Sequence, residues 1–146
     1  MKPPGRKVKH KLFLKEELND RFIGLVSSEA DYKVSLLLNK KLNINLKSNS
    51  PIEIPGSKGS ETLFSRFTSN SKFNDLTIDL ISNRSGNEFL TRKYPNLDYV
   101  LKLKGNKISD SINEVVSKIR SIDGVIAVFI LEDKLQLEEN ILEVIP

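Results

Sequence analysis

The sequence predicts a single α+β domain, built on a mostly antiparallel, twisted sheet with two main helices on one face. Several segments alternate apolar and polar residues with a period of two, as half-buried strands do. Only two segments carry apolar residues at helical spacing, within residues 28–42 and 111–122. Runs of neighbouring strands with so few helices favour α+β over an alternating parallel architecture.

Composition limits the class of protein. The chain has 146 residues, of which 38% are apolar and 29% charged, enough for one domain with a core. It contains no cysteine, which excludes disulfides and thiolate catalysis. No apolar run approaches the roughly 20 residues that cross a membrane, and the basic start lacks the apolar core of a signal peptide. We therefore expect a cytoplasmic protein without membrane contact.

We expect three regions along the chain. Residues 1–6 form a flexible basic lead, residues 7–131 the α+β domain, and residues 132–146 an acidic segment that docks as a short helix or as a tail. The first strand, at residues 7–14, carries four lysines in or beside it that are candidate nucleic-acid contacts: Lys7, Lys9, Lys11 and Lys15. Alternatively, these lysines solubilise the arm and guard an edge strand. The lack of interleaved aromatic residues favours this alternative.

The next segments predict a strand, a helix and another strand. Residues 22–26 form a strand in which Gly24 marks a bulge or a close backbone approach. A helix opens at Ser28, and its apolar stripe is Val34, Leu37, Leu38 and Leu42. Residues 42–46 alternate as a half-buried strand, and residues 48–60, rich in Ser, Pro and Gly, predict a loop.

The middle of the chain predicts a hairpin. Residues 62–68 form a strand with Leu63 and Phe67 on one face and Phe64 and Arg66 on the other. Residues 69–74 form a polar turn, and residues 76–80 return as the paired strand. Residues 88–96 are expected to be irregular.

Residues 97–131 predict a strand, a helix and a second strand. One face of the first strand is apolar, with Leu97, Tyr99, Leu101 and Leu103. Ser111 and Glu114 have capping-box spacing, and Asp123-Gly124 ends the helix. Residues 125–131 are continuously apolar, as expected of a strand covered on both faces.

Several of these segments resemble the IPExxxDY family, a set of small proteins from Bacteroidota. They are KHKL at 9–12, FIGLVSSEADYK at 22–33, the strand around 64–67 and LDYVLKLK at 97–104. Asp98-Tyr99 matches the end of the naming motif, whereas Arg92, Lys93 and Tyr94 stand where the family has Ile-Pro-Glu. The resemblance spans most of the chain, and the family has no assigned activity.

Two Asp-Tyr pairs are the most distinctive polar features, and they give four candidate site residues: Asp31, Tyr32, Asp98 and Tyr99. Asp31 stands at a helix start, where capping and the helix dipole favour a carboxylate. Tyr32 suits the rim of the sheet. Structural roles explain both pairs, and the alternative is a small polar site where the pairs converge.

Residues that would mark catalysis are absent. His10 is the only histidine, so a catalytic triad or a histidine metal site lacks its partners. The glycines fit neither the Walker nor the dinucleotide fingerprint. We therefore expect no catalytic residues, no cofactor and no specific metal.

Three functions stay open at this point. The first is a non-catalytic protein-interaction module or adaptor with a protein partner. The second is an RNA-associated protein that uses the basic arm, with Lys102 and Lys104 as further contacts. The third is a small-ligand regulatory domain, by analogy of fold. The oligomeric state does not follow from the sequence.

Overall fold

A computed structural model describes residues 20–55, 59, 61–71, 76–105 and 108–131. The elements in chain order are β1 (Arg21–Val26), α2 (Asp31–Leu42), β2 (Lys47–Pro55), β3 (Glu61–Ser71), β4 (Leu76–Ser82), β5 (Arg84–Ser85), β6 (Glu88–Phe89), β7 (Tyr99–Gly105), α3 (Ile108–Arg120) and β8 (Ala127–Leu131). The strand predicted at 7–14, the basic lead and the acidic segment 132–146 lie outside the described residues.

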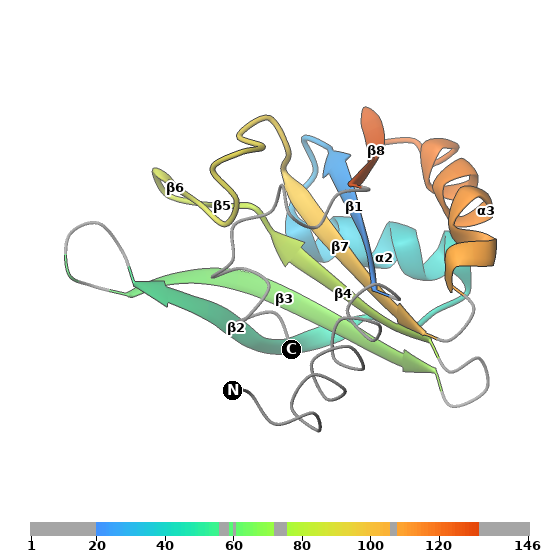
Figure 1. The fold of residues 1–146 in the computed structure, drawn as a ribbon, viewed down its shortest axis with the longest axis horizontal. Helices are drawn as coiled ribbons and strands as arrows, with labels where there is room; N and C mark the ends of the chain where they lie inside the picture. The colour runs from blue at the N-terminus through green and yellow to red at the C-terminus, as the bar shows by residue number, and fades with distance from the viewer. Residues whose placement is uncertain (1–19, 56–58, 60, 72–75, 106–107, 132–146) are drawn as a thin grey trace, which may run out of the picture.

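Six of the strands form one twisted sheet in the order β2-β3-β4-β7-β1-β8, and every neighbouring pair is antiparallel (Figure 1). Because β7 and β8 both pair with β1, they run parallel to each other with β1 between them. Helix α3 therefore carries the chain from β7 across β1 to the edge of the sheet. The predicted α+β class, with a mostly antiparallel sheet and two helices, is confirmed.

Both helices pack on the same face of the sheet and enclose the main core (Figure 1). The predicted apolar stripes are confirmed, since Val34 and Leu38 of α2 and Ile112, Val116 and Ile119 of α3 are buried. They meet the side chains that alternate strand residues direct to this face: Ile23, Leu25, Ile78, Leu80, Tyr99, Leu101 and Leu103.

A second apolar cluster lies on the opposite face, where the segment between β4 and β7 packs over the sheet. Its buried members are Phe22, Ile52, Phe64, Ile81, Leu90, Leu97, Val100 and Leu131. Leu97 was expected on the same face of the strand as Tyr99, but it precedes β7 and packs in this second cluster. Its side chain occupies the space that Gly24 leaves open, because a Cβ on Gly24 would lie 2.5 Å from Leu97 Cδ1. Gly24 was expected to mark a bulge or a close backbone approach, but β1 pairs in unbroken register there, and a side chain, not the backbone, comes close.

The prediction of a strand at 42–46 was wrong, and so was that of a loop for residues 48–55, which belong to β2. Asn43 adopts a left-handed conformation, with φ 55°, and ends α2. The Asn39 side chain then holds a turn by bonding both the N–H and the carbonyl of Leu46. Strand β2 begins only at Lys47 and absorbs Pro51 in a bulge, where its register with β3 shifts between Asn49 and Ile52. An edge strand tolerates proline because its outer amides need no ladder partner.

Three local predictions also need correction. Helix α2 begins at Asp31, after Ala30 as N-cap, and not at Ser28. Helix α3 begins at Ile108, so Ser111 lies within the helix and is not its cap. Strand β8 is not covered on both faces, because it is an edge strand whose Phe129 side chain is 50% exposed.

Candidate functional site

Asp98 joins three segments at one end of the sheet. Its Oδ2 accepts a hydrogen bond from the Ser27 N–H at 2.9 Å, and its Oδ1 lies 3.1 Å from Arg84 Nε. Its own N–H donates to the Leu25 carbonyl at 2.8 Å. The Asp98 carboxylate, just before β7, therefore links the residue after β1 to the start of β5.

Tyr99 reaches the same region from the start of β7. Its hydroxyl donates to the main-chain carbonyl of Glu29, and its side chain is buried. Burial raises the pKa of Tyr99 to about 12, and the carboxylates of Asp31, Asp98 and Glu29 add to this effect. The structure thus brings three of the four predicted site residues together around one phenol.

Tyr32, the fourth predicted residue, stands apart from this group. Its side chain is 62% exposed on α2. Asp31 Oδ1 accepts a hydrogen bond from the Tyr32 N–H at 2.7 Å, so the carboxylate satisfies an amide of the first helical turn. The contacts described for these three residues, Asp31, Asp98 and Tyr99, all go to other groups of the protein. Their role in the structure is therefore to stabilise the fold.

A second polar cluster, which the sequence did not predict, lies on the sheet face opposite the helices. Asp79 is buried and accepts a hydrogen bond from Thr68 Oγ1 at 2.7 Å. Arg66 Nη1 lies 3.6 Å from the same carboxylate, and Lys102 stands directly opposite Asp79 on the neighbouring strand. In the sequence, the one sign of this cluster was that β4 and β7 each hold a charged residue between apolar neighbours, which the structure buries.

Lys102 is a buried member of this cluster. Burial lowers the pKa of Lys102, whereas Asp20 and Asp79 act in the opposite direction. Its Nζ lies 3.9 Å from Asp20 Oδ2. This burial removes Lys102 from the surface that the RNA hypothesis offered, while Lys104 stays exposed.

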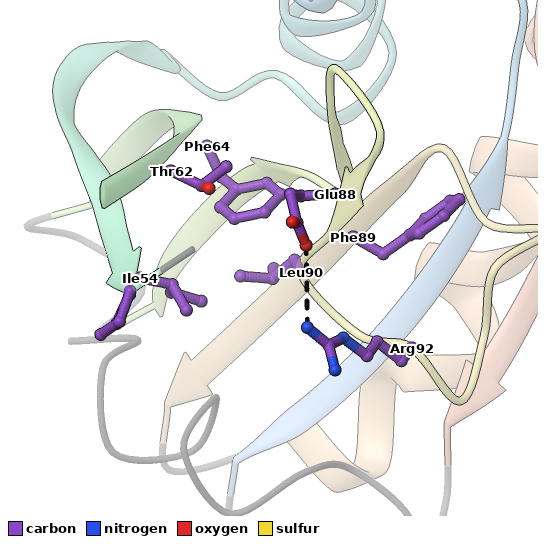
Figure 2. A pocket seen from close by; sticks show the side chains of 8 residues that line it. Ile54, Thr62, Phe64, Glu88, Phe89, Leu90 and Arg92 are labelled. Atoms are coloured by element: carbon purple, nitrogen blue, oxygen red, sulfur yellow. Dashed lines mark ion pairs between the residues drawn. The ribbon is translucent and has the colours of Figure 1, made fainter. Parts of the chain in front are cut away.

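A small pocket of about 130 Å³ opens where β2 and β3 meet β6. Its apolar lining includes Ile54, Phe64 and Leu90. Figure 2 shows Glu88 and Arg92 joined across one side of it, with their ion pair at 3.7 Å. A cavity of about this size holds a molecule no larger than benzene.

A wider, shallower groove of about 490 Å³ lies between the two helices. Leu37 and Ile122 form its apolar lining, and three lysines, Lys40, Lys41 and Lys118, border it. Lys118 also lies 3.4 Å from Glu114 on its own helix. The groove is open on the helix side of the molecule and offers no enclosed site.

The described part of the chain offers little support for a metal site or for a membrane-spanning helix. Within it, no three His, Asp or Glu side chains are grouped so that they could hold a metal ion. Among the same residues, no helix is both long and apolar enough to cross a membrane. The four candidate nucleic-acid lysines, Lys7, Lys9, Lys11 and Lys15, lie outside the described residues, as does His10.

No protein-family model matches the chain, and no curated protein matches it.

Proposed function

We propose that this protein is a non-catalytic protein-interaction module whose binding edge is strand β8. A single observation carries the proposal: among the residues that the structure describes, β8 is an open sheet edge, and it holds no charged residue. Open edges of this kind bind an added strand through main-chain hydrogen bonds.

The chemistry of β8 supports strand addition. It is the last strand in the sheet order, and among the described residues only β1 pairs with it. Residues 125–131 read VIAVFIL, with no charge, no proline and no glycine. Two of their side chains are notably exposed, Ile126 at 70% and Phe129 at 50%. An added strand would bury both.

The opposite edge of the sheet supports the proposal by contrast. Strand β2 contains Pro51 and Pro55, a register shift, and exposed charges at Lys47 and Glu53. These are the features with which proteins prevent edge-to-edge pairing. Since only one edge carries them, the bare edge at β8 favours a binding role.

Matched surface variants test the proposal. Phe129→Glu places a charge on the β8 edge, and Leu63→Glu places the same charge on β3 at an equally exposed apolar position, 50% in both cases. Immobilised wild-type protein and both variants are incubated with nuclease-treated extract of the native cells. We expect a protein partner that wild type and Leu63→Glu retain and Phe129→Glu loses at least tenfold. Equal retention by all three, or none, would contradict a binding role for β8.

The same experiment without nuclease examines the RNA alternative. A partner that disappears on nuclease treatment, whatever the residue at 129, would favour RNA binding through the basic arm. The resemblance to the IPExxxDY family forms part of the proposal, but it does not choose between these functions because the family has no assigned activity.

Small-ligand binding is the second candidate, and the pocket in Figure 2 favours it. The pocket combines apolar side chains such as Phe64 and Leu90 with the charged pair of Glu88 and Arg92, which could orient a small polar ligand. Thr62→Phe would fill the pocket from β3. A ligand found by fragment screening should bind wild type and lose at least tenfold in affinity for this variant. Unchanged affinity would place the ligand elsewhere.

A further inference from the structure

We propose that the pocket in Figure 2 binds a free aliphatic α-amino acid, with the side chain inside the pocket and the charged head group at its mouth. This inference rests on the proposed small-ligand function of the pocket and names the class of ligand. The volume of the pocket, its apolar lining and its pair of opposite charges carry the inference.

The interior of the pocket suits a short aliphatic side chain. Its volume is about 130 Å³, whereas an engineered apolar cavity of roughly 150 Å³ holds benzene. Phe64 and Leu90 in the lining are buried, and Ile54 is half-buried. An isobutyl group is smaller than benzene and fits this space. A benzyl group is larger than benzene and exceeds it.

The charged pair along one side of the pocket selects the head group. The side chains of Glu88 and Arg92 are 29% and 68% exposed, so both charges remain in contact with solvent. Arg92 Nη2 lies 3.7 Å from Glu88 Oε2, whereas hydrogen-bonded ion pairs have separations of about 2.7–2.9 Å. An α-amino acid carries an ammonium and a carboxylate on one carbon. Its ammonium donates to Glu88 and its carboxylate accepts from Arg92, so that one long ion pair is replaced by two hydrogen-bonded ones.

The same pair disfavours ligands that carry only one charge. A carboxylate without an ammonium would bring a second negative charge beside Glu88, and an ammonium alone would bring a second positive charge beside Arg92. No other residue in the described lining is charged. Arg84 lies over the Phe89 ring, but its charge is already paired with Asp98. A zwitterion is therefore the ligand for which each charge gains a partner.

A buried side chain holds the segment that carries the charged pair. Asn83 Oδ1 accepts a hydrogen bond from the Thr91 N–H at 2.9 Å, and Asn83 Nδ2 donates to the carbonyls of Tyr94 and Leu97 at 2.9 and 2.8 Å. The Asn83 carbonyl also accepts from the Leu90 N–H at 2.8 Å. The fold itself thus positions the segment before a ligand binds, which lowers the entropic cost of binding.

Three probes with the same hydrocarbon chain test the choice of head group. L-leucine carries both charges, isocaproate lacks the ammonium, and isoamylamine lacks the carboxylate. Each is titrated into the full chain at neutral pH by isothermal titration calorimetry. We expect leucine to bind with a Kd of about 1 mM or below, and each singly charged probe to bind at least tenfold more weakly.

Variants of the charged pair test which group meets which charge. Glu88→Gln should weaken leucine binding at least tenfold without weakening isocaproate binding, and Arg92→Gln should do the same for leucine without weakening isoamylamine binding. Glu114→Gln is the matched control, because Glu114 and Lys118 form an ion pair of the same sequence spacing on α3, at 3.4 Å. It should leave leucine affinity unchanged. Ion pairs this exposed contribute little to stability, so the variants should fold.

Several outcomes would overturn the inference. They are equal affinities for the three probes, leucine binding that Thr62→Phe or both charge variants leave unchanged, and absence of leucine binding at about 10 mM. In each case, a fragment that binds wild type and is lost in Thr62→Phe would leave the small-ligand function of the pocket standing. If a fragment screen also finds no such molecule, that function is overturned as well.

Discussion

Asp98 accepts a hydrogen bond from the Ser27 main chain at 2.9 Å, across 71 positions of sequence. The contact fixes the turn between β1 and α2 against the residue that precedes β7. The same turn is held by the Tyr99 hydroxyl on the Glu29 carbonyl and by Ser27 Oγ on the Gly124 carbonyl. Three elements distant in sequence thus meet at one short connection.

Two replacements of Asp98 distinguish the contribution of its hydrogen bond to stability from the contribution of its charge. Asp98→Ala leaves the Ser27 amide without its acceptor and should lower the free energy of unfolding by about 1–3 kcal/mol. Asp98→Asn retains an oxygen acceptor and loses only the charge on the partly exposed pair with Arg84, so the loss should be below about 1 kcal/mol. Urea unfolding measures both. Equal losses would show that the charge, and not the amide contact, matters at this position.

Gly24 and Leu97 should be energetically coupled. Gly24→Ala places a methyl group against the Leu97 side chain and should destabilise the protein by about 1–3 kcal/mol through overpacking. Leu97→Ala alone should cost about 2–5 kcal/mol because it opens a cavity. The double variant should cost clearly less than the sum, since the new methyl enters the vacated space. An additive result in a double-mutant cycle would mean that the two residues do not share this space.

The raised pKa of Tyr99 predicts that the protein loses stability at high pH. Its pKa is about 12 in the folded protein and about 10 in an unfolded chain, so between these values the unfolded state releases its proton first. The stabilisation is complete below pH 10 and disappears as pH rises to 12, at about 1.4 kcal/mol per pH unit. Tyr99→Phe should remove this component of the slope and cost about 1 kcal/mol at neutral pH through the lost hydrogen bond. Unfolding measured from pH 8 to 11.5 tests this, and identical slopes would refute it.

Asp79 should be the most sensitive member of the polar cluster opposite the helices. Asp79→Ala removes the buried carboxylate that faces both Arg66 and Lys102, and should cost about 3–5 kcal/mol. Thr68→Val keeps the side-chain volume nearly constant and removes only the 2.7 Å hydrogen bond to Asp79, so about 1 kcal/mol is expected. Comparable small losses for both variants, in thermal or urea unfolding, would mean that the cluster is well hydrated.

Much of the fold follows from local pattern. The alternation at Leu76, Ile78 and Leu80 and the stripe from Ile112 to Ile119 each reflect which residues must leave water. These signals lie within one element and depend on its own period. They therefore predicted strands β1, β3, β4 and β7, both helices and the α+β class.

The candidate site was only partly predictable. Asp31, Asp98 and Tyr99 were selected as distinctive residues, but their meeting depends on antiparallel pairing of β1 with β7. The buried cluster around Asp79 escaped notice because a charged residue in a strand normally faces water. Its members share a face only through the registers of β3, β4 and β7.

The sequence alone determined the apolar period of most segments, and so the secondary structure and the buried side of β1, β3, β4, β7 and both helices. The tertiary structure decided which strands became edges. Residues 125–131 are apolar enough for a central strand, yet β8 lies at the margin of the sheet because β1 takes the place between β7 and β8. Residues 48–55 read as a loop, yet they pair with β3 because a bulge at an edge accepts Pro51. Strand order depends on contacts between segments that are distant in sequence, and the periodicity within one segment does not predict these contacts.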